Sequence, residues 1–178
     1  DLLIANAGIG HGTGKYLMER PEQTHELSMI NVIGVSNTVM PIINRMAARG
    51  RGQIALMASI AGFAAVMQSP SYAATKAYVK HWGEALHGRL KPFGVEVTTI
   101  CPGYVKSAMT DANRFKMPFL METDRAVDIM VRGMEAGKAR VAFPWQITWP
   151  VGLASVLPSF IATRLNSLKR KPKLPPID

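Results

Sequence analysis

Tyr72 and Lys76 stand four residues apart, and this pairing is the first feature of the chain that suggests chemistry. The surrounding segment, residues 70–90, is predicted to form a helix that begins at a proline and ends before Pro92, so both side chains share one face. An ammonium group about 5 Å from a phenol lowers the pKa of that phenol by roughly two, from its ordinary value of about 10. The pair is therefore expected to exchange a proton with a bound molecule near neutral pH.

Three polar or glycine-containing segments directly follow predicted strands. The strands are predicted at residues 2–5, 53–58 and 95–100, and the segments that follow them are Asn6-Ala7-Gly8, Ser59 and Pro102-Gly103. The carboxyl ends of parallel strands meet at one edge of a sheet, where ligands bind in α/β proteins. We therefore expect the three segments to gather there, with the Ser59 hydroxyl holding a carbonyl oxygen jointly with Tyr72.

Predicted strands and helices alternate along the chain, which places it in the α/β class with parallel βαβ units. Helices are predicted at residues 21–48, 70–90 and 124–136, the last capped by Thr123 and ended by Gly137, and a final short strand at residues 140–143. The fold is accordingly predicted as a Rossmann-like, doubly wound parallel sheet. Residues 1–143 are interpreted as the catalytic portion of this domain, and residues 144–178 as an apolar segment followed by a basic tail.

The ordered set of motifs resembles the short-chain dehydrogenase/reductase family over residues 1 to about 110. The motifs are Asn6-Ala7-Gly8, Asn31, Ser59, Tyr72, Lys76 and Pro102-Gly103. The resemblance implies that Ser59 orients a substrate carbonyl or hydroxyl, that Tyr72 transfers the proton, and that Lys76 lowers the pKa of Tyr72 and holds the nicotinamide ribose. It also implies that Asn31 completes a water-linked proton relay to Lys76.

The same resemblance implies NAD or NADP as the cofactor, and a three-layer αβα sandwich of which this chain is the C-terminal portion. The residues that it assigns to cofactor binding are Asn6, Ala7, Gly8, Tyr72, Lys76, Pro102, Gly103, Val105 and Ser107. Ala5 and Ser107 depart from the family pattern, because a second asparagine and a threonine are usual at these positions.

The glycines of residues 8–14 fit neither a P-loop nor the dinucleotide fingerprint, which requires a third glycine at a position that this chain fills otherwise. The glycine-rich turn that receives the pyrophosphate is therefore expected upstream of Asp1. The chain is expected to lack the N-terminal half of its domain, and with it the residue that selects NAD or NADP.

These residues predict an oxidoreductase that interconverts an alcohol and a carbonyl by hydride transfer, with Tyr72 as proton donor or acceptor. An apolar small-molecule substrate is favoured by several apolar side chains near the predicted site. They are Val66, Met67, Met109, Phe115, Met117, Phe119, Leu120 and Met121, and they fit a role in the core equally well. The alternatives are a non-catalytic binding or scaffold protein of the same fold, and an epimerase or dehydratase that uses the same tyrosine.

Composition indicates one globular domain, with 178 residues of which 48% are hydrophobic and 19% are charged. The single cysteine, Cys101, excludes an internal disulfide and favours a cytoplasmic location. The four histidines and one cysteine show no metal-binding spacing, so no metal is predicted. The net charge of +9 includes a basic run at Lys169, Arg170, Lys171 and Lys173, which is interpreted as a solvated tail and not as a nucleic-acid site.

Two apolar regions suggest contacts beyond the core of the domain. The helices that carry Asn31 and Tyr72 have further apolar residues, Val39, Ile43, Tyr78 and Trp82, which predict a homodimer or homotetramer. Residues 151–168 are apolar apart from interruptions at Pro158 and Arg164. This segment is predicted to be a helix packed on the core or on a partner subunit. Peripheral contact with a membrane is ranked second, because Pro158 interrupts the apolar face.

Overall fold

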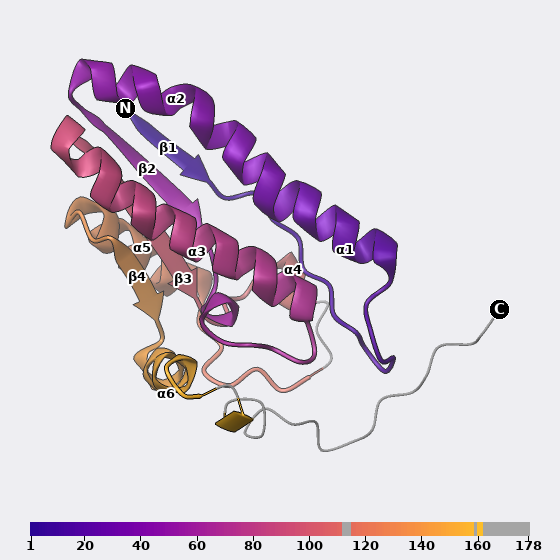
Figure 1. Ribbon diagram of the computed structural model, residues 1–178. Coiled ribbons are helices and arrows are strands. Elements are labelled where there is room, and N and C mark those ends of the chain that lie inside the picture. Colours follow the sequence, from indigo (N-terminus) through magenta and orange to yellow (C-terminus); the bar gives the residue numbers. More distant parts are fainter. Residues whose placement is uncertain (112–114, 159, 162–178) are drawn as a thin grey trace.

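The sheet of the computed structural model, which describes residues 1–111, 115–158 and 160–161, has four parallel strands in chain order (Figure 1). They are β1 (Leu2–Ala5), β2 (Gly52–Met57), β3 (Val95–Pro102) and β4 (Arg140–Phe143). Across neighbouring strands, Leu2 lies opposite Gln53, Gly52 opposite Val95, and Thr99 opposite Arg140. The four predicted strands are confirmed, with β2 beginning one residue earlier and β3 ending two residues later than expected.

Helices cover both faces of this sheet, which gives a three-layer arrangement (Figure 1). One face carries α3 (Pro70–Leu90) and a long continuous helix made of α1 (Pro21–Ser28), the π-helical η1 (Met29–Gly34) and α2 (Val35–Arg49). The other face carries α5 (Thr123–Glu135). The alternation of side chains along β2 explains the layers, because Ile54 and Leu56 are buried with α2 and α3 whereas Ala55 packs with α5. The predicted doubly wound parallel sheet is confirmed.

Four short elements complete the part of the chain that the structure describes. They are the 3-10 turns η2 (Ile60–Phe63) and η3 (Lys91–Phe93), the single turn α4 (Ala108–Asp111), and α6 (Trp145–Ser155), which follows β4. The helix predicted at residues 151–168 instead begins at Trp145, because Pro144 has an extended backbone that suits the residue before a helix. α6 ends at Ser155, and residues 159 and 162–168 of the prediction lie outside the described residues. Residues 162–178, which include the basic tail, lie outside the described residues.

The ends of α5 show one wrong and one confirmed boundary. Thr123 is the first helical residue and not the cap, a position that Glu122 occupies. The Thr123 hydroxyl instead donates to the carbonyl of Lys106 at 2.8 Å, so it fastens the helix to the preceding loop. The helix ends before Gly137 as predicted, and Gly137 has the left-handed backbone, with φ of 58°, that favours glycine at this position.

The side chains predicted to face a partner subunit do not share one surface. Val39 is fully buried against the sheet and Ile43 packs on the same core, so the prediction is wrong for these two residues. The reason is that α2 lies over β1 and β2, and its apolar stripe is used there. Tyr78 is exposed and stacks on the ring of Trp82, with 6.0 Å between the centroids.

By length and composition alone, one helix within the described ranges could cross a membrane, the continuous segment Pro21–Arg49. Its buried residues include Leu27, Val35, Val39 and Met46. Three of these four belong to the core that the helix shares with β1 and β2, which is the arrangement of a core helix on a sheet.

Candidate active site

Ser59 lies just beyond β2, where the carboxyl end of the strand meets α3. Its hydroxyl accepts a hydrogen bond from the amide of Ala61 at 3.1 Å, and this bond starts the η2 turn. The same hydroxyl donates to the Pro102 carbonyl at 3.4 Å and forms a side-chain hydrogen bond with Tyr72. The structure thus brings Ser59, Tyr72 and the end of β3 together, as the sequence predicted.

The acid–base pair in the first turns of α3 differs from its predicted electrostatics. Burial raises the pKa of Tyr72, and the hydrogen bond with Ser59 offsets this only in part. The Lys76 ammonium lies 5.8 Å from the centroid of the Tyr72 ring and donates to the Met57 carbonyl at 2.9 Å. Burial lowers the pKa of Lys76 from 10.5 to about 8. The expected net lowering of the pKa of Tyr72 is therefore wrong for this structure, because the loss of water is the largest influence on the phenol.

Gly8 brings the loop after β1 against the lysine. A β-carbon on Gly8 would lie 3.2 Å from both the Lys76 ammonium and the side-chain oxygen of Asn31. Any larger residue would therefore crowd the ammonium, whereas glycine lets the loop approach it closely. The ammonium has three N–H donors, so beside its bond to Met57 it can also donate to a hydroxyl group of a bound ligand.

A cleft of about 300 Å³ opens where β1 ends. Asn6 and Ala7, both exposed, form one side of this cleft, and Met29 and Ile30 of η1 form another. Ile4 of β1 and Val35 and Thr38 of α2 also line the cleft, so it lies between β1 and this helix, and none of the proton-transfer residues lines it. Contact of Asn6 and Ala7 with a cofactor stays a prediction.

Asn31 lies in the π-helical turn and is fully buried. Its side-chain oxygen accepts from the Ile9 amide at 2.9 Å, and its nitrogen donates to the Ile9 carbonyl at 2.9 Å and to the Thr75 hydroxyl at 3.1 Å. Thr75 in turn donates to the carbonyl of Tyr72 at 2.8 Å. The Asn31 amide therefore ties the Gly8 loop to α3, and a relay from Asn31 to Lys76 stays a prediction.

Gly62 allows η2 to lie directly on α3. A β-carbon at this position would come within 2.6 Å of the backbone carbon and oxygen of Lys76. The absence of a side chain at residue 62 thus lets the turn after Ser59 pack on the helix that carries Tyr72 and Lys76. Neither Gly62 nor Thr75 was predicted to have a role. For Thr75 a signal existed, because a threonine hydroxyl in a helix commonly donates to the carbonyl three or four residues earlier.

The segment after β3 is held by backbone hydrogen bonds and by the hydroxyls of Thr110 and Thr123. The amide of Gly103 donates to the Phe143 carbonyl at 2.7 Å, and Val105 pairs with Met121 in an isolated parallel bridge. The amide of Ser107 donates to the Thr110 hydroxyl at 2.8 Å. Pro102-Gly103 therefore lies beside Ser59 as predicted, and Ser107 remains exposed at the same edge.

The side chains predicted to contact a substrate divide into core and surface. Met121 is buried with Ile100 and Val141, so it belongs to the core under α5, and its predicted role in a substrate wall is wrong. Val66, Met67 and Met117 are half-buried. The remaining four are at least 40% exposed, and we call them the apolar wall: Met109, Phe115, Phe119 and Leu120.

The apolar wall approaches the active site from two directions. The sulfur of Met109 lies 3.3 Å from the place of a β-carbon on Gly10, so the wall touches the loop after β1. Phe115 packs edge-to-face on Tyr104, with 5.9 Å between the ring centroids. Tyr104 is close enough to Tyr72 to raise its pKa slightly, and burial raises the pKa of Tyr104 itself. Tyr104 was not predicted to belong to the site, although it directly follows the Pro102-Gly103 motif.

Known proteins resemble this chain in sequence and in structure. The family model described as short chain dehydrogenase matches residues 1–117. An uncharacterized oxidoreductase of Myxococcus xanthus is 41% identical over 159 residues, which are 89% of this chain and 62% of that protein. A very-long-chain 3-oxoacyl-CoA reductase of Ajellomyces capsulatus is 30% identical over 155 residues, 85% of this chain and 45% of that protein.

Among solved structures, a short-chain dehydrogenase from Sphingobium yanoikuyae in complex with NADPH matches with a TM-score of 0.75 at 24% identity. The match covers 89% of this chain and 66% of that one. The chain thus spans less than two thirds of the length of the curated relatives above.

Proposed function

This chain belongs to the short chain dehydrogenase family, and we propose that the protein containing it interconverts an alcohol and a carbonyl with NAD or NADP. The observation that carries this proposal is the hydrogen-bonded pair Ser59 and Tyr72 beside the buried Lys76. Two hydroxyl groups in contact can both donate to one carbonyl oxygen and polarise it. The bond from Ser59 to Pro102 is long, at 3.4 Å, so this proton can turn towards a substrate.

Tyr72 is the proton donor when the carbonyl is reduced. Because burial raises its pKa, the phenol stays protonated at neutral pH and acts as an acid in that direction. Its O–H bond breaks as the proton passes to the substrate oxygen, and the Lys76 ammonium stabilises the phenolate that remains. In the oxidising direction the phenolate takes the proton of the alcohol.

The residues around Lys76 fit a nicotinamide dinucleotide. The Lys76 ammonium has N–H donors beyond the one bonded to Met57, and these suit a ribose hydroxyl. The cofactor, when bound, supplies or accepts the hydride at the substrate carbon. Contacts with it are assigned to Tyr72, Lys76, Asn6, Ala7, Gly8, Pro102, Gly103, Val105 and Ser107, all of which lie within the segment that matches the family.

An apolar substrate is supported by the apolar wall, because exposed aromatic and methionine side chains beside a polar site form an adaptable binding surface. The name of the A. capsulatus relative, a very-long-chain 3-oxoacyl-CoA reductase, supports a carbonyl on a long acyl chain. Steroid and long-chain ketones tested against sugars would check this choice, and a preference for sugars would overturn it.

The proposal also includes a homodimer or homotetramer in the cytoplasm. The surface of the helices α1 to α3 supports the oligomer, because Met29, Ile33, Met40 and Tyr78 are exposed there. Sedimentation of the full-length protein would check it, and a monomer at micromolar concentration would contradict it.

The test of the reaction is Tyr72→Phe in the full-length protein, with Tyr78→Phe on the same helix as the matched control. The first change removes only the transferable proton, so turnover should fall by about 10³-fold while the cofactor Kd changes by no more than a few-fold. The Tyr78 hydroxyl contacts Ser36 on the surface, and its removal should leave turnover within about twofold.

The alternatives predict different readouts for the wild-type protein. A scaffold protein would consume neither substrate nor cofactor, whether or not it binds nicotinamide dinucleotides. An epimerase or dehydratase would convert its substrate without net change in the ratio of reduced to oxidised nicotinamide. Turnover that persists in Tyr72→Phe would overturn the assignment of the proton donor.

A further inference from the structure

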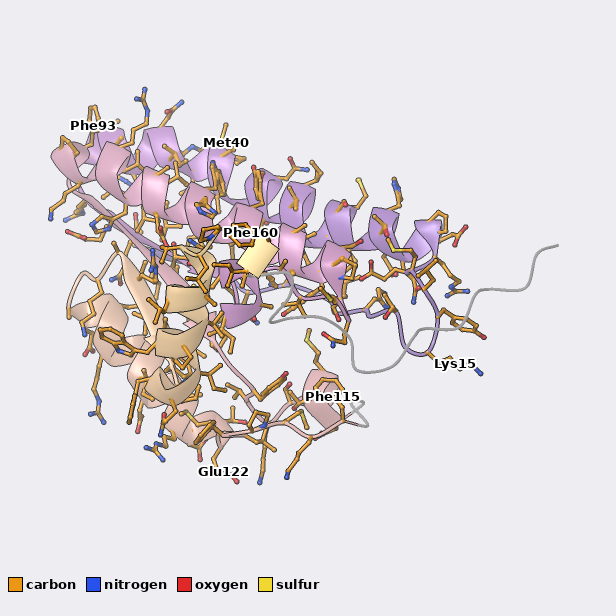
Figure 2. The ribbon with its side chains drawn as sticks, turned by 60° about the horizontal axis from the view of Figure 1, so that its bottom comes forward. Lys15, Met40, Phe93, Phe115, Glu122 and Phe160 are labelled. Carbon is orange, nitrogen blue, oxygen red and sulfur yellow. The ribbon has the colours of Figure 1, made fainter. Side chains whose placement is uncertain are left out.

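Helix α6 presents a stripe of large apolar side chains to solvent. Trp145, Trp149, Leu153 and Val156 are 68%, 76%, 67% and 77% exposed, and their spacing of three or four residues places them on one face. Phe160 beyond the helix is 72% exposed as well (Figure 2). The opposite side of α6 contacts η2 and β4, so the stripe faces away from the domain. A contiguous apolar surface of this kind marks an interaction site.

The chemistry of the surrounding sequence restricts the partner. No charged residue occurs from Val141 to Thr163, whereas residues 164–178 contain five basic residues and one acidic residue. An apolar segment beside a cluster of lysine and arginine suits a surface that is apolar inside and anionic outside. Tryptophan prefers the boundary between these two environments, because its ring is apolar and its N–H group is polar.

α6, as the structure describes it, is too short to cross a bilayer. It has 11 residues, whereas about 20 are needed to span the hydrocarbon core. One side of α6 packs on η2 and β4, so the exposed stripe is the side that can meet a membrane, with the helix lying along the surface. We propose that α6 seats its tryptophan stripe in the headgroup region of a membrane that carries anionic lipids, and that the basic residues after Thr163 add electrostatic attraction.

The position of α6 connects this surface to the active site. The helix follows β4 at the carboxyl edge of the sheet, and it contacts η2, the turn that begins at Ser59 (Figure 1). Pro144 packs against this edge, since a β-carbon on Gly103 would lie 2.9 Å from its ring. Docking through α6 therefore brings the carboxyl edge of the sheet close to the lipid surface. The docking itself does not depend on the proposed reaction.

A second copy of the chain fits the same stripe less well. In a two-fold interface the same patch meets itself, so α6 of one chain would pack near α6 of the other. Each chain carries a net charge of +9, so two copies that meet through this patch also repel each other. An anionic membrane turns the same charges into attraction.

The test is cosedimentation of the full-length protein with vesicles of phosphatidylcholine containing about one third phosphatidylglycerol, and with vesicles of phosphatidylcholine alone. We expect binding to the anionic vesicles, at least about tenfold weaker binding to the neutral ones, and weakening by added salt. Trp149→Ser and Leu153→Ser should each weaken binding by about tenfold. The control is Phe93→Ser. Phe93 is 55% exposed and lies just after the C-terminal end of α3, so its replacement should leave vesicle binding unchanged.

Two further readouts keep the outcomes distinct. Turnover of a water-soluble ketone should be the same in Trp149→Ser and wild type, so the docking and the reaction can fail separately. Tryptophan emission should shift to shorter wavelength with anionic vesicles. Absence of vesicle binding, equal binding by Trp149→Ser, or a vesicle-free dimer that Trp149→Ser dissociates would each overturn the proposal.

Discussion

The proton-transfer site and the apolar wall lie at the same edge of the sheet, but they are held in different ways. Ser59, Lys76 and Asn31 are nearly or fully buried, and each makes hydrogen bonds to another segment of the chain. Phe119 and Leu120 of the wall are 54% and 40% exposed. One region is fixed by hydrogen bonds between several elements, and the other is a surface of apolar groups.

This difference separates reaction from specificity. A proton donor works only when its distance to the substrate is fixed within a few tenths of an ångström, so the site residues need rigid support. An apolar wall works by adaptable contact, and its members can change without disturbing the chemistry. Mutations in the two regions should therefore differ in kind as well as in size.

The largest effect is expected for Gly62→Ala, which tests whether the site depends on close packing. The new methyl group would meet the backbone of Lys76, which cannot move without shifting α3. The free energy of unfolding should fall by about 3 kcal/mol. Gly88→Ala on α3 is the control, because nothing lies within 4 Å of its β-carbon, and it should gain about 0.5–1 kcal/mol. Equal effects in urea unfolding would show that the η2 contact is loose.

Asn31→Ala should come next, because it leaves the amide and carbonyl of Ile9 without their buried partner. A loss of about 2–3 kcal/mol in the free energy of unfolding is expected. Asn37→Ala, at an exposed position on the same continuous helix, should change it by less than about 0.5 kcal/mol. A comparable loss of unfolding free energy in both variants would show that the hydrogen bonds of Asn31 do not hold the site rigid.

Lys76→Met tests the cost of a buried charge. The folded pKa of Lys76 is about 8 and its ordinary value is 10.5, so the folded protein binds this proton less readily than the unfolded chain does. The resulting penalty is complete below pH 8, shrinks as the pH rises from 8 to 10.5, and is absent above that range. Lys76→Met should therefore stabilise the cofactor-free protein by about 2 kcal/mol at pH 7. A difference between the two proteins that stays constant from pH 7 to 10 would contradict this.

The smallest effect is expected in the apolar wall, at Phe119. This residue has a φ of 56°, in the left-handed region that favours glycine. Phe119→Gly should raise the free energy of unfolding by about 0.5 kcal/mol while raising KM for an apolar ketone. Phe115→Gly removes a ring that packs on Tyr104 at a position without positive φ, so it should lower stability. If Phe119→Gly lowered the free energy of unfolding and Phe115→Gly raised it, the Phe119 side chain would be supporting the fold.

The strands, and the gathering of Ser59 and Pro102-Gly103 at one edge of the sheet, could be predicted from the sequence because both depend on short-range pattern. Ser59 and Pro102-Gly103 follow apolar strands, and parallel strands must end at a common edge. The π-helical turn at Asn31 and the contact of Gly62 with Lys76 depend on how two distant segments pack. The spacing of apolar residues along the chain does not predict such contacts, so these features appear only in the folded structure.

The errors have the same origin. A methionine or valine in an apolar run fits the core and the surface equally, and Met121 and Val39 prove to be buried. The pKa of Tyr72 was predicted from its distance to one charge, whereas removal from water is the larger influence. The division at residue 143, the cytoplasmic location and the oligomeric state stay predictions.

The order of the strands has a consequence for how the protein folds. Because β1, β2, β3 and β4 are neighbours in chain order and all parallel, a helical segment separates every strand from its partner. Local hairpins cannot start this sheet, so each pairing must close a long loop first, which slows folding. The active site draws on the segments after β1, β2 and β3 and on two helices between them. It is therefore expected to assemble late, after the last of these pairings has formed.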